Sequence, residues 1–207
     1  MRSISSTLLC MLMLMMCACS VVNAQTKEKP KKLIIAVNTP HGVGYFTDNK
    51  GTFLFNKQFE GVSKFSEGLA RVQQNGKEGF INSKGKVVIP CIYDRVGGFS
   101  EGLARVQKYL YGPWGYINTK GEVVIPCIYD EADWFSEGLA YVKQNGKYGF
   151  INTQGEVVAP CIYDDAGIFS EGLAHVKQNE KWSIINTQGK VIVAECNSNT
   201  FWSVVEL

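Results

Sequence analysis

The stretch FSEGLARVQKYLYGPWGYINTKGEVVIPCIYD, residues 99–130, decides the fold because its parts recur along the chain. The hexapeptide FSEGLA begins again, unchanged, at Phe65, Phe135 and Phe169. Its leucine stands at positions 69, 103, 139 and 173, so the copies are 34 to 36 residues apart. A period of this length is typical of repeat proteins, in which each unit buries its apolar face only against a neighbouring unit.

An incomplete copy precedes the first hexapeptide. Residues 35–37 match the GLARV segment, and residues 44–46 match Gly79-Phe80-Ile81. Residues 51–65 then align with residues 85–99 without a gap. Five units are therefore expected to fill residues 33–207.

Each unit shows β-strand patterns and no sustained helical periodicity. The segment GLARVQ alternates in polarity as a half-buried strand does. The pair Asn75-Gly76 then predicts a type I′ hairpin turn, which leads into a second strand, GFIN. The third strand, VVIPCIYD at residues 87–94, is rich in branched and aromatic residues, and its Pro90 favours a sheet edge or a bend. We expect an all-β tandem array of about five three-stranded β-meander units, with a closed, propeller-like ring as the alternative.

The second complete unit carries the one insertion in the array. Residues 108–113, KYLYGP, stand where the other units have a tight Asn-Gly turn. Insertions in repeat proteins usually lie in loops on one face, which is often the binding face. Four irregular aromatic residues lie in or near this loop, and they form the predicted binding patch: Tyr109, Tyr111, Trp114 and Trp134. Such rings stack on sugars or anchor a protein partner, although core packing is the alternative for each of them.

The last unit departs from the pattern and is expected to cap the array. Asn179-Glu180 replaces Asn-Gly, and Ser183 replaces the glycine of the second strand. Terminal units of repeat proteins are commonly atypical in this way. The end of the chain, FWSVVEL at residues 201–207, is predicted to add a closing strand.

These motifs resemble the WG-repeat family, also called KWG repeats, over residues 33 to about 196. Its units carry Trp-Gly-Phe/Tyr-Ile, a Lys-Gly turn, Val-Ile-Pro, Tyr-Asp and FSEGLA. The Trp-Gly pair itself is intact only at Trp114-Gly115. The resemblance implies β-repeats in secreted or envelope proteins of bacteria, with no common enzymatic activity.

The N-terminus predicts export. Residues 8–18, LLCMLMLMMCA, form an apolar run that suits a signal peptide and is too short for a transmembrane helix. Cleavage before Gln25 would give a signal peptide of residues 1–24, a Lys-rich linker of residues 25–32 and no transmembrane span in the mature chain. The alternative is a lipoprotein anchored at Cys19.

Charge and motif content narrow the function classes. Removing residues 1–24 leaves 20 basic and 19 acidic residues, and this balance argues against nucleic acid as a partner. Neither the histidines nor the glycines form a catalytic or phosphate-binding motif. We therefore expect no catalytic residue, no cofactor and no metal site. The predicted function is an exported, non-enzymatic binding or scaffolding protein of the bacterial envelope that engages a protein; the alternative is a module that binds a cell-wall glycan.

Cysteines and acids recur with the units, which favours structural roles. One cysteine falls in each of four units, at Cys91, Cys127, Cys161 and Cys196. Equivalent positions in stacked units point the same way, so buried thiols are favoured over disulfides. The glutamate of each FSEG and the acids after each third strand are expected to accept hydrogen bonds from backbone N–H groups where the chain reverses.

Overall fold

A computed structural model describes residues 34–38, 44–48, 50–55 and 58–196. Every regular element in these ranges is a β-strand, as predicted. The described residues contain no helix that is long and apolar enough to cross a membrane. The predicted signal peptide, linker, Cys19 anchor and closing strand lie outside the described residues and stay predictions.

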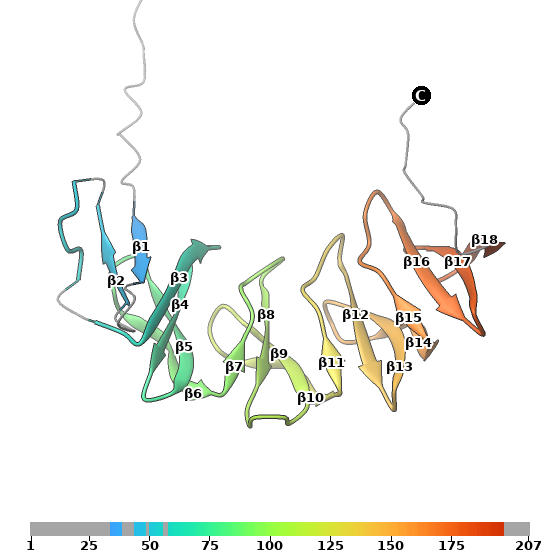
Figure 1. Ribbon diagram of the computed structural model, residues 1–207, viewed down its shortest axis with the longest axis horizontal. Coiled ribbons are helices and arrows are strands. Elements are labelled where there is room, and N and C mark those ends of the chain that lie inside the picture. Colours follow the sequence, from blue (N-terminus) through green and yellow to red (C-terminus); the bar gives the residue numbers. More distant parts are fainter. Residues whose placement is uncertain (1–33, 39–43, 49, 56–57, 197–207) are drawn as a thin grey trace, which may run out of the picture. The chain divides into compact units, whose positions relative to one another are not determined.

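Four antiparallel sheets of four strands follow one another along the chain (Figure 1), so the predicted all-β tandem array is confirmed. The incomplete first unit contributes a two-stranded sheet of β1 (Ile35–Asn38) and β2 (Gly44–Thr47). The first sheet holds β3 (Gly61–Ser66), β4 (Leu69–Gln74), β5 (Lys77–Asn82) and β6 (Val87–Tyr93). The second sheet holds β7 (Arg95–Val96), β8 (Leu103–Gln107), β9 (Trp114–Asn118) and β10 (Val123–Tyr129). The third sheet holds β11 (Glu131–Ala132), β12 (Leu139–Gln144), β13 (Lys147–Asn152) and β14 (Val157–Tyr163), and the fourth holds β15 (Asp165–Ala166), β16 (Leu173–Gln178), β17 (Lys181–Asn186) and β18 (Val191–Cys196).

The predicted three-stranded unit is one strand short. The three long strands exist in each of the four sheets, but a further strand precedes them; in the first sheet this strand has six residues, and in the second sheet it is only Arg95–Val96. This strand pairs with β8 and follows β6 after the single residue Asp94. Two residues carry no readable alternation, so the periodicity of the sequence did not reveal it.

The FSEG segments form hairpin turns, which we call the SEG turns: residues 66–68, 100–102, 136–138 and 170–172. In the second of them, Glu101 and Gly102 have φ values of 52° and 80°. Ser100 and Leu103 exchange two backbone hydrogen bonds across this turn, of 2.9 and 3.1 Å. Two consecutive residues with positive φ are the signature of a type I′ turn, which suits the twist of paired strands.

Each SEG turn is hydrogen-bonded to the next one along the chain, in a series that we call the SEG ladder. The Ser100 hydroxyl donates to the carbonyl of Phe135 (2.8 Å), and the Glu101 carboxylate accepts from the Gly138 N–H (2.8 Å). The preceding and following turns repeat both kinds of bond. The prediction that these glutamates accept backbone hydrogen bonds is confirmed for Glu67, Glu101 and Glu137, and the donors belong to the following unit.

The glycine of the Trp-Gly motif is required because a bulge in the outer strand lies against it. A Cβ atom on Gly115 would stand 2.5 Å from the Ile125 carbonyl oxygen and 2.7 Å from the Cys127 amide nitrogen. Gly79 and Gly149 meet the same backbone in their own sheets. The bulge contains the proline of the third strand, and that strand is an edge of its sheet, as Pro90 predicted.

The last sheet has a shorter bulge and a different register. Trp182 pairs with Cys196 and Ile184 pairs with Val193, whereas Trp114 pairs with Tyr129 and Tyr116 pairs with Ile125. Between these two pairs the outer strand of the last sheet advances by three residues, whereas the outer strand of the second sheet advances by four. Cys196 therefore takes the place of the tyrosine, and its predicted equivalence to the other three cysteines is wrong.

The incomplete first unit also needs a correction of one residue. Gly44 pairs with Phe59 and Thr47 pairs with Phe53, just as Glu78 pairs with Tyr93 and Ile81 with Val87. Gly44 is therefore equivalent to Glu78 and not to the motif glycine Gly79.

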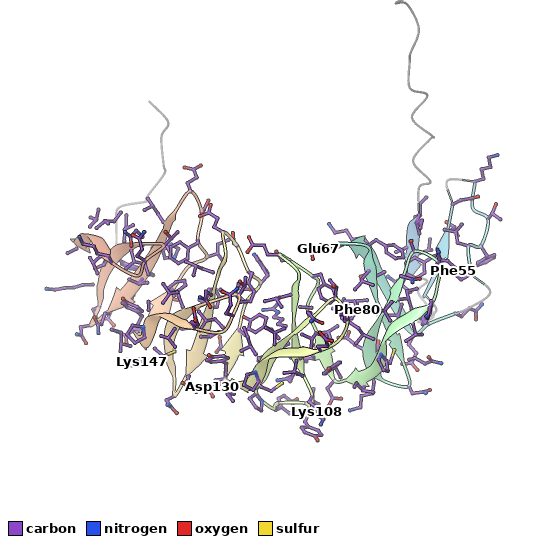
Figure 2. The ribbon with its side chains drawn as sticks, turned by 180° about the vertical axis from the view of Figure 1, so that it is seen from behind. Phe55, Glu67, Phe80, Lys108, Asp130 and Lys147 are labelled. Atoms are coloured by element: carbon purple, nitrogen blue, oxygen red, sulfur yellow. The ribbon has the colours of Figure 1, made fainter. Side chains whose placement is uncertain are left out.

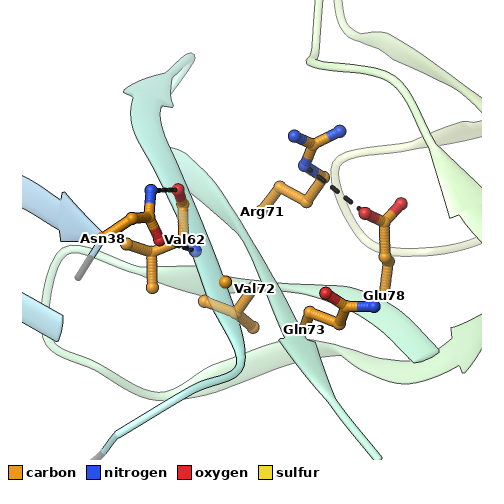
Figure 3. Close-up of a pocket in the computed structure, with 7 residues that line it drawn as sticks. Asn38, Val62, Arg71, Val72, Gln73 and Glu78 are labelled. Atoms are coloured by element: carbon orange, nitrogen blue, oxygen red, sulfur yellow. Dashed lines mark hydrogen bonds and ion pairs between the residues drawn. The ribbon is translucent and has the colours of Figure 1, made fainter. Parts of the chain in front are cut away.

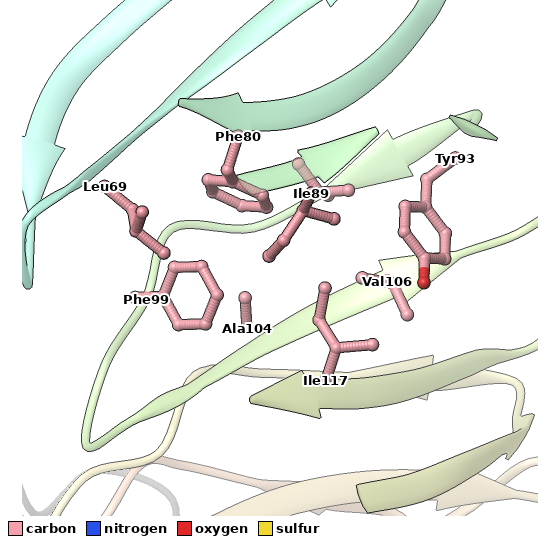
Figure 4. Packing of buried hydrophobic residues seen from close by; sticks show 9 residues of the cluster. Leu69, Phe80, Ile89, Tyr93, Phe99, Ala104, Val106 and Ile117 are labelled. Carbon is pink, nitrogen blue, oxygen red and sulfur yellow. The ribbon is translucent and has the colours of Figure 1, made fainter. Parts of the chain in front are cut away.

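Apolar clusters join each sheet to the next, as expected for units that cannot bury a face alone. In the cluster of Figure 4, Leu69, Phe80 and Ile89 of the first sheet pack against Phe99 and neighbouring residues of the second sheet. The rings of Phe80 and Phe99 are 4.8 Å apart. Equivalent aromatic pairs join the later sheets: Tyr116–Phe135 at 4.9 Å and Phe150–Phe169 at 5.0 Å.

Replacing the motif glycine is expected to destabilise the protein. In Gly115→Ala, the new methyl group would be forced against the backbone of β10, which should lower the free energy of unfolding by about 2–3 kcal/mol. Urea unfolding measures this change. Gly98→Ala is the matched control, because nothing lies within 4 Å of a Cβ atom at Gly98; equal losses in the two variants would contradict the explanation.

The SEG ladder makes a second prediction. Glu101→Ala should lower the free energy of unfolding by about 0.5–1 kcal/mol, because the Gly138 N–H loses its acceptor. Glu171→Ala is the control, since Glu171 has nearly the same φ value (53° against 52°) but accepts no ladder bond from a described residue. A larger loss in Glu171→Ala than in Glu101→Ala, measured by urea unfolding, would count against the ladder.

Candidate binding site

The inserted loop, residues 108–113, is anchored like the hairpin turns of the other units. It follows β8, whereas a SEG turn precedes β8, so the two lie at opposite ends of that strand; Figure 2 labels Lys108 of the loop and Glu67 of a SEG turn. The Leu110 N–H donates to the Asp94 carboxylate (2.7 Å), which also accepts from Lys77 Nζ (2.8 Å). In the next hairpin the Gly146 N–H donates to Asp130 in the same way. The insertion therefore keeps the acid that caps each turn.

Three residues at the end of this loop are exposed, and we call Tyr109, Leu110 and Tyr111 the aromatic tip. The side chains of Tyr109 and Tyr111 are 64% and 88% exposed, and Leu110 is also exposed. The Gly112 N–H donates to the Tyr109 carbonyl (2.8 Å) and closes the turn. The hairpins of the other three complete units have polar turn residues here, so among these four units the tip is an apolar feature of one.

Tyr111 adopts a left-handed backbone conformation, with φ of 63°. A bulky side chain in this region costs roughly 1–2 kcal/mol, which is why turns usually place Gly or Asn there. Backbone strain of this kind gathers at functional sites, because the fold holds a side chain where the local preference would not. Tyr111 is thus both the most exposed and the most strained residue of the tip.

The loop rests on Gln107, whose side chain is 5% exposed. Its Nε2 donates to the Gly112 carbonyl (2.5 Å), while Oε1 has no partner among the described residues. The Lys108 ammonium lies 5.6 Å from the centre of the Tyr109 ring. These contacts hold the base of the loop and leave the tip uncovered.

The two tryptophans of the predicted patch lie in a separate group. Trp114 is half-buried against the cluster between the second and third sheets, and the Arg105 guanidinium lies 5.4 Å from its ring. Arg105 also forms an ion pair with the buried Asp133 (3.1 Å). The Asp133 carboxylate accepts from the backbone N–H of Trp134, whose side chain is 49% exposed.

The predicted patch therefore consists of two parts. Tyr109 and Tyr111 share one turn, and Trp114 and Trp134 are linked through Arg105 and Asp133. No ring contact joins the tyrosines to the tryptophans among the described residues. Sequence reasoning missed Leu110, although its place between two tyrosines of an insertion was the available signal. That these residues bind a partner stays a prediction.

Asp133 accepts a backbone hydrogen bond, from the Trp134 N–H, as predicted for the acids after the third strand, and it also belongs to a buried polar network. Glycine stands at the equivalent positions, Gly97 and Gly167, of the neighbouring sheets. The Tyr116 hydroxyl donates to the Asp133 carbonyl (2.6 Å), and burial raises the pKa of Tyr116. Burial, followed by a hydrogen bond with Asp133, also raises the pKa of Tyr141. Within the part of the chain that the structure describes, this network lies between the second and third sheets.

A pocket of about 220 Å³ lies beside the first sheet (Figure 3). Three of its four polar side chains are already engaged with the protein. Asn38 exchanges two hydrogen bonds with the Val62 backbone, the Glu78 carboxylate accepts from the Val96 N–H (2.7 Å), and the Arg71 guanidinium donates to the Val96 carbonyl (3.2 Å). Glu78 occupies the position that Trp114 holds in the next sheet. The pocket therefore offers few free groups to a ligand.

The three described cysteines are half-buried thiols that face backbone carbonyls. Cys127 Sγ lies 3.8 Å from the Val106 oxygen, and Cys161 Sγ lies 4.0 Å from the Val142 oxygen. Burial raises the pKa of both thiols, which disfavours the reactive thiolate. The side chain of Cys196 lies outside the described residues.

Several solved structures resemble the chain at low sequence identity. They include virginiamycin B lyase from Staphylococcus aureus, with 13% identity and a TM-score of 0.39 over 84% of this chain and 73% of that one. A streptogramin B lyase matches at 13% identity and a TM-score of 0.35 over 83% and 72%. A protein of unknown function from Bacteroides caccae matches at 12% identity and a TM-score of 0.31 over 81% and 82%. No curated protein matches the chain.

The family comparison agrees with the repeats seen in the structure. The model of the WG containing repeat matches residues 46–77, 79–109, 114–148 and 148–182, which together make up more than half of the chain. These four copies span the sheets whose motif glycines lie against the outer-strand bulge. The chain therefore belongs to the WG-containing repeat family.

Proposed function

We propose that this protein is an exported, non-enzymatic scaffold of the bacterial envelope that binds another protein through its aromatic tip. The observation that carries the proposal is the aromatic tip itself: two exposed tyrosines and a leucine on a loop whose base is tied to the β-scaffold. Tyrosine side chains are enriched among the residues that dominate protein interfaces, because they supply a large contact area with few rotatable bonds. Export rests on the apolar run of residues 8–18.

The shape of the tip favours a protein over a sugar. The Lys108 ammonium lies over the Tyr109 ring, and Leu110 separates the two tyrosines. A loop that presents aromatic and aliphatic groups together fits a complementary apolar pocket, where such anchors are desolvated on binding. A glycan platform is the second candidate, and the observation that favours it is the half-exposed Trp134 beside the Arg105–Asp133 ion pair.

Tyr111→Gly separates binding from stability. Glycine adopts the left-handed conformation without a steric cost, so the free energy of unfolding should rise by about 1 kcal/mol, while capture of the partner is lost. The assay is a pull-down with the purified protein as bait and solubilised envelope proteins and cell-wall sacculi offered in parallel. The expected result is one protein captured by the parent chain and at least tenfold less of it by Tyr111→Gly, a loss of about 1.4 kcal/mol or more.

Glu180→Gly is the matched control for this experiment. Glu180 also has a positive φ, of 64°, but it lies in the last hairpin and away from the tip. This variant should keep full capture of the partner. Unchanged capture by Tyr111→Gly would contradict the proposal, and retention on sacculi that Trp134→Ala abolishes would replace it with the glycan function.

A further inference from the structure

The base of each hairpin carries an in-register pair of residues, one on the first strand of the sheet and one on the second. In the third sheet this pair is Glu131 and Lys143, which form an ion pair of 2.8 Å. In the fourth sheet the pair is Asp165 and Lys177. Both times an acid on the first strand faces a lysine on the second, so the pair adds no net charge to its hairpin.

The sheet that carries the aromatic tip departs from this pattern. Its in-register pair is Arg95 and Gln107. The Gln107 side chain holds the inserted loop, because its Nε2 donates to the Gly112 carbonyl. Arg95 is exposed and forms no ion pair with a described residue. At the base of the tip, a cation without an ion-pair partner thus stands where the next two sheets have an acid.

Lys108 adds a second cation of this kind. It is exposed, its ammonium lies 5.6 Å from the centre of the Tyr109 ring, and it forms no ion pair with a described residue. The acid that caps the loop, Asp94, is already paired with Lys77 Nζ at 2.8 Å. The charges of Arg95 and Lys108 therefore remain, and they give the surroundings of the tip a net positive charge.

The fold gives these two cations little to do. Even a paired charge at an exposed position stabilises a folded protein only slightly. Opposite charges across an interface, in contrast, steer two proteins together and select the right partner. Arginine is also enriched in protein interfaces. Cations beside an apolar contact are therefore complementary to a surface on which acids flank the apolar groups.

We infer that the aromatic tip binds a protein segment in which Asp or Glu side chains stand beside apolar ones. This inference rests on the proposed function and specifies the chemistry of the partner. Tyr109, Leu110 and Tyr111 supply the apolar contact, and Arg95 and Lys108 attract the carboxylates. Because exposed charges are screened beyond about 10 Å at 0.1 M salt, the interaction depends on ionic strength.

Selection from a display library of random peptides, with the full chain as bait, tests the inference. The enriched peptides should combine Asp and Glu with aromatic or aliphatic residues. Fluorescence anisotropy then compares one such peptide with its amide form, in which Asn and Gln replace every Asp and Glu. The acidic form should bind at least about tenfold more tightly at roughly 0.05 M salt, and less than about threefold more tightly at roughly 0.5 M salt, where charges are screened.

Arg95→Glu places at the base of the tip the kind of residue that the next two sheets have there. It should weaken binding of the acidic peptide at least about tenfold, because a carboxylate then repels the peptide. Lys84→Glu is the matched control, with the same change of net charge. Lys84 is exposed in the turn after β5, at the SEG-turn end of the strands, so this variant should change binding less than about twofold.

Tyr111→Gly separates the failure of this inference from the failure of the proposed function. If Tyr111→Gly loses peptide binding while the parent chain binds the acidic and amide forms equally, only the acidic partner is overturned. Unchanged peptide binding by Tyr111→Gly would overturn both. A selection that enriches no acidic peptide would also overturn the inference. Binding of the parent chain to vesicles of phosphatidylcholine and phosphatidylglycerol that Arg95→Glu abolishes would replace the protein partner with an anionic membrane surface.

Discussion

The structure depends on one constraint: the apolar faces of each sheet are buried against the neighbouring sheets of the array. The aromatic pairs Phe80–Phe99, Tyr116–Phe135 and Phe150–Phe169 mark this contact at nearly constant ring separations of 4.8 to 5.0 Å. The SEG ladder runs alongside and ties each turn to the next with a serine hydroxyl and a glutamate carboxylate. Because stability comes from such nearest-neighbour contacts, the two ends of the array need different residues from the middle.

The repeated contacts between units leave the hairpins at the other end of the strands free to differ in sequence and in function. Sheet contacts and the SEG ladder hold the units, so a hairpin at the opposite end of β8 can vary without loss of the fold. The insertion at residues 108–113 uses this freedom, yet it keeps the hydrogen bond from its backbone to Asp94 that the ordinary hairpins make to their own acid. A rigid scaffold with one altered loop is a common way to place binding residues. The strained backbone of Tyr111 is consistent with that use.

Residue patterns predicted much of this fold and little of the site's geometry. Asn75-Gly76 and Asn145-Gly146 form the expected hairpins, with positive φ at all four residues. The two-residue strands were missed, because pairing with β8 and not their own sequence makes Arg95–Val96 a strand. The ion pair of Asp133 with Arg105 was missed for a similar reason, because it joins two units and no local sequence pattern indicates a contact across 28 positions.

The sequence by itself determined the repeat, its three long strands, its turns and its membership of a β-repeat family, since these follow from local periodicity and turn chemistry. Only the tertiary structure decided where one sheet ends and the next begins, which tyrosines are exposed, and that Cys196 stands at a tyrosine position. The physical reason is that register and burial arise from pairing between strands. A bulge shortened by one residue in β18 leaves the local strand pattern intact and brings Cys196, in place of a tyrosine, opposite Trp182.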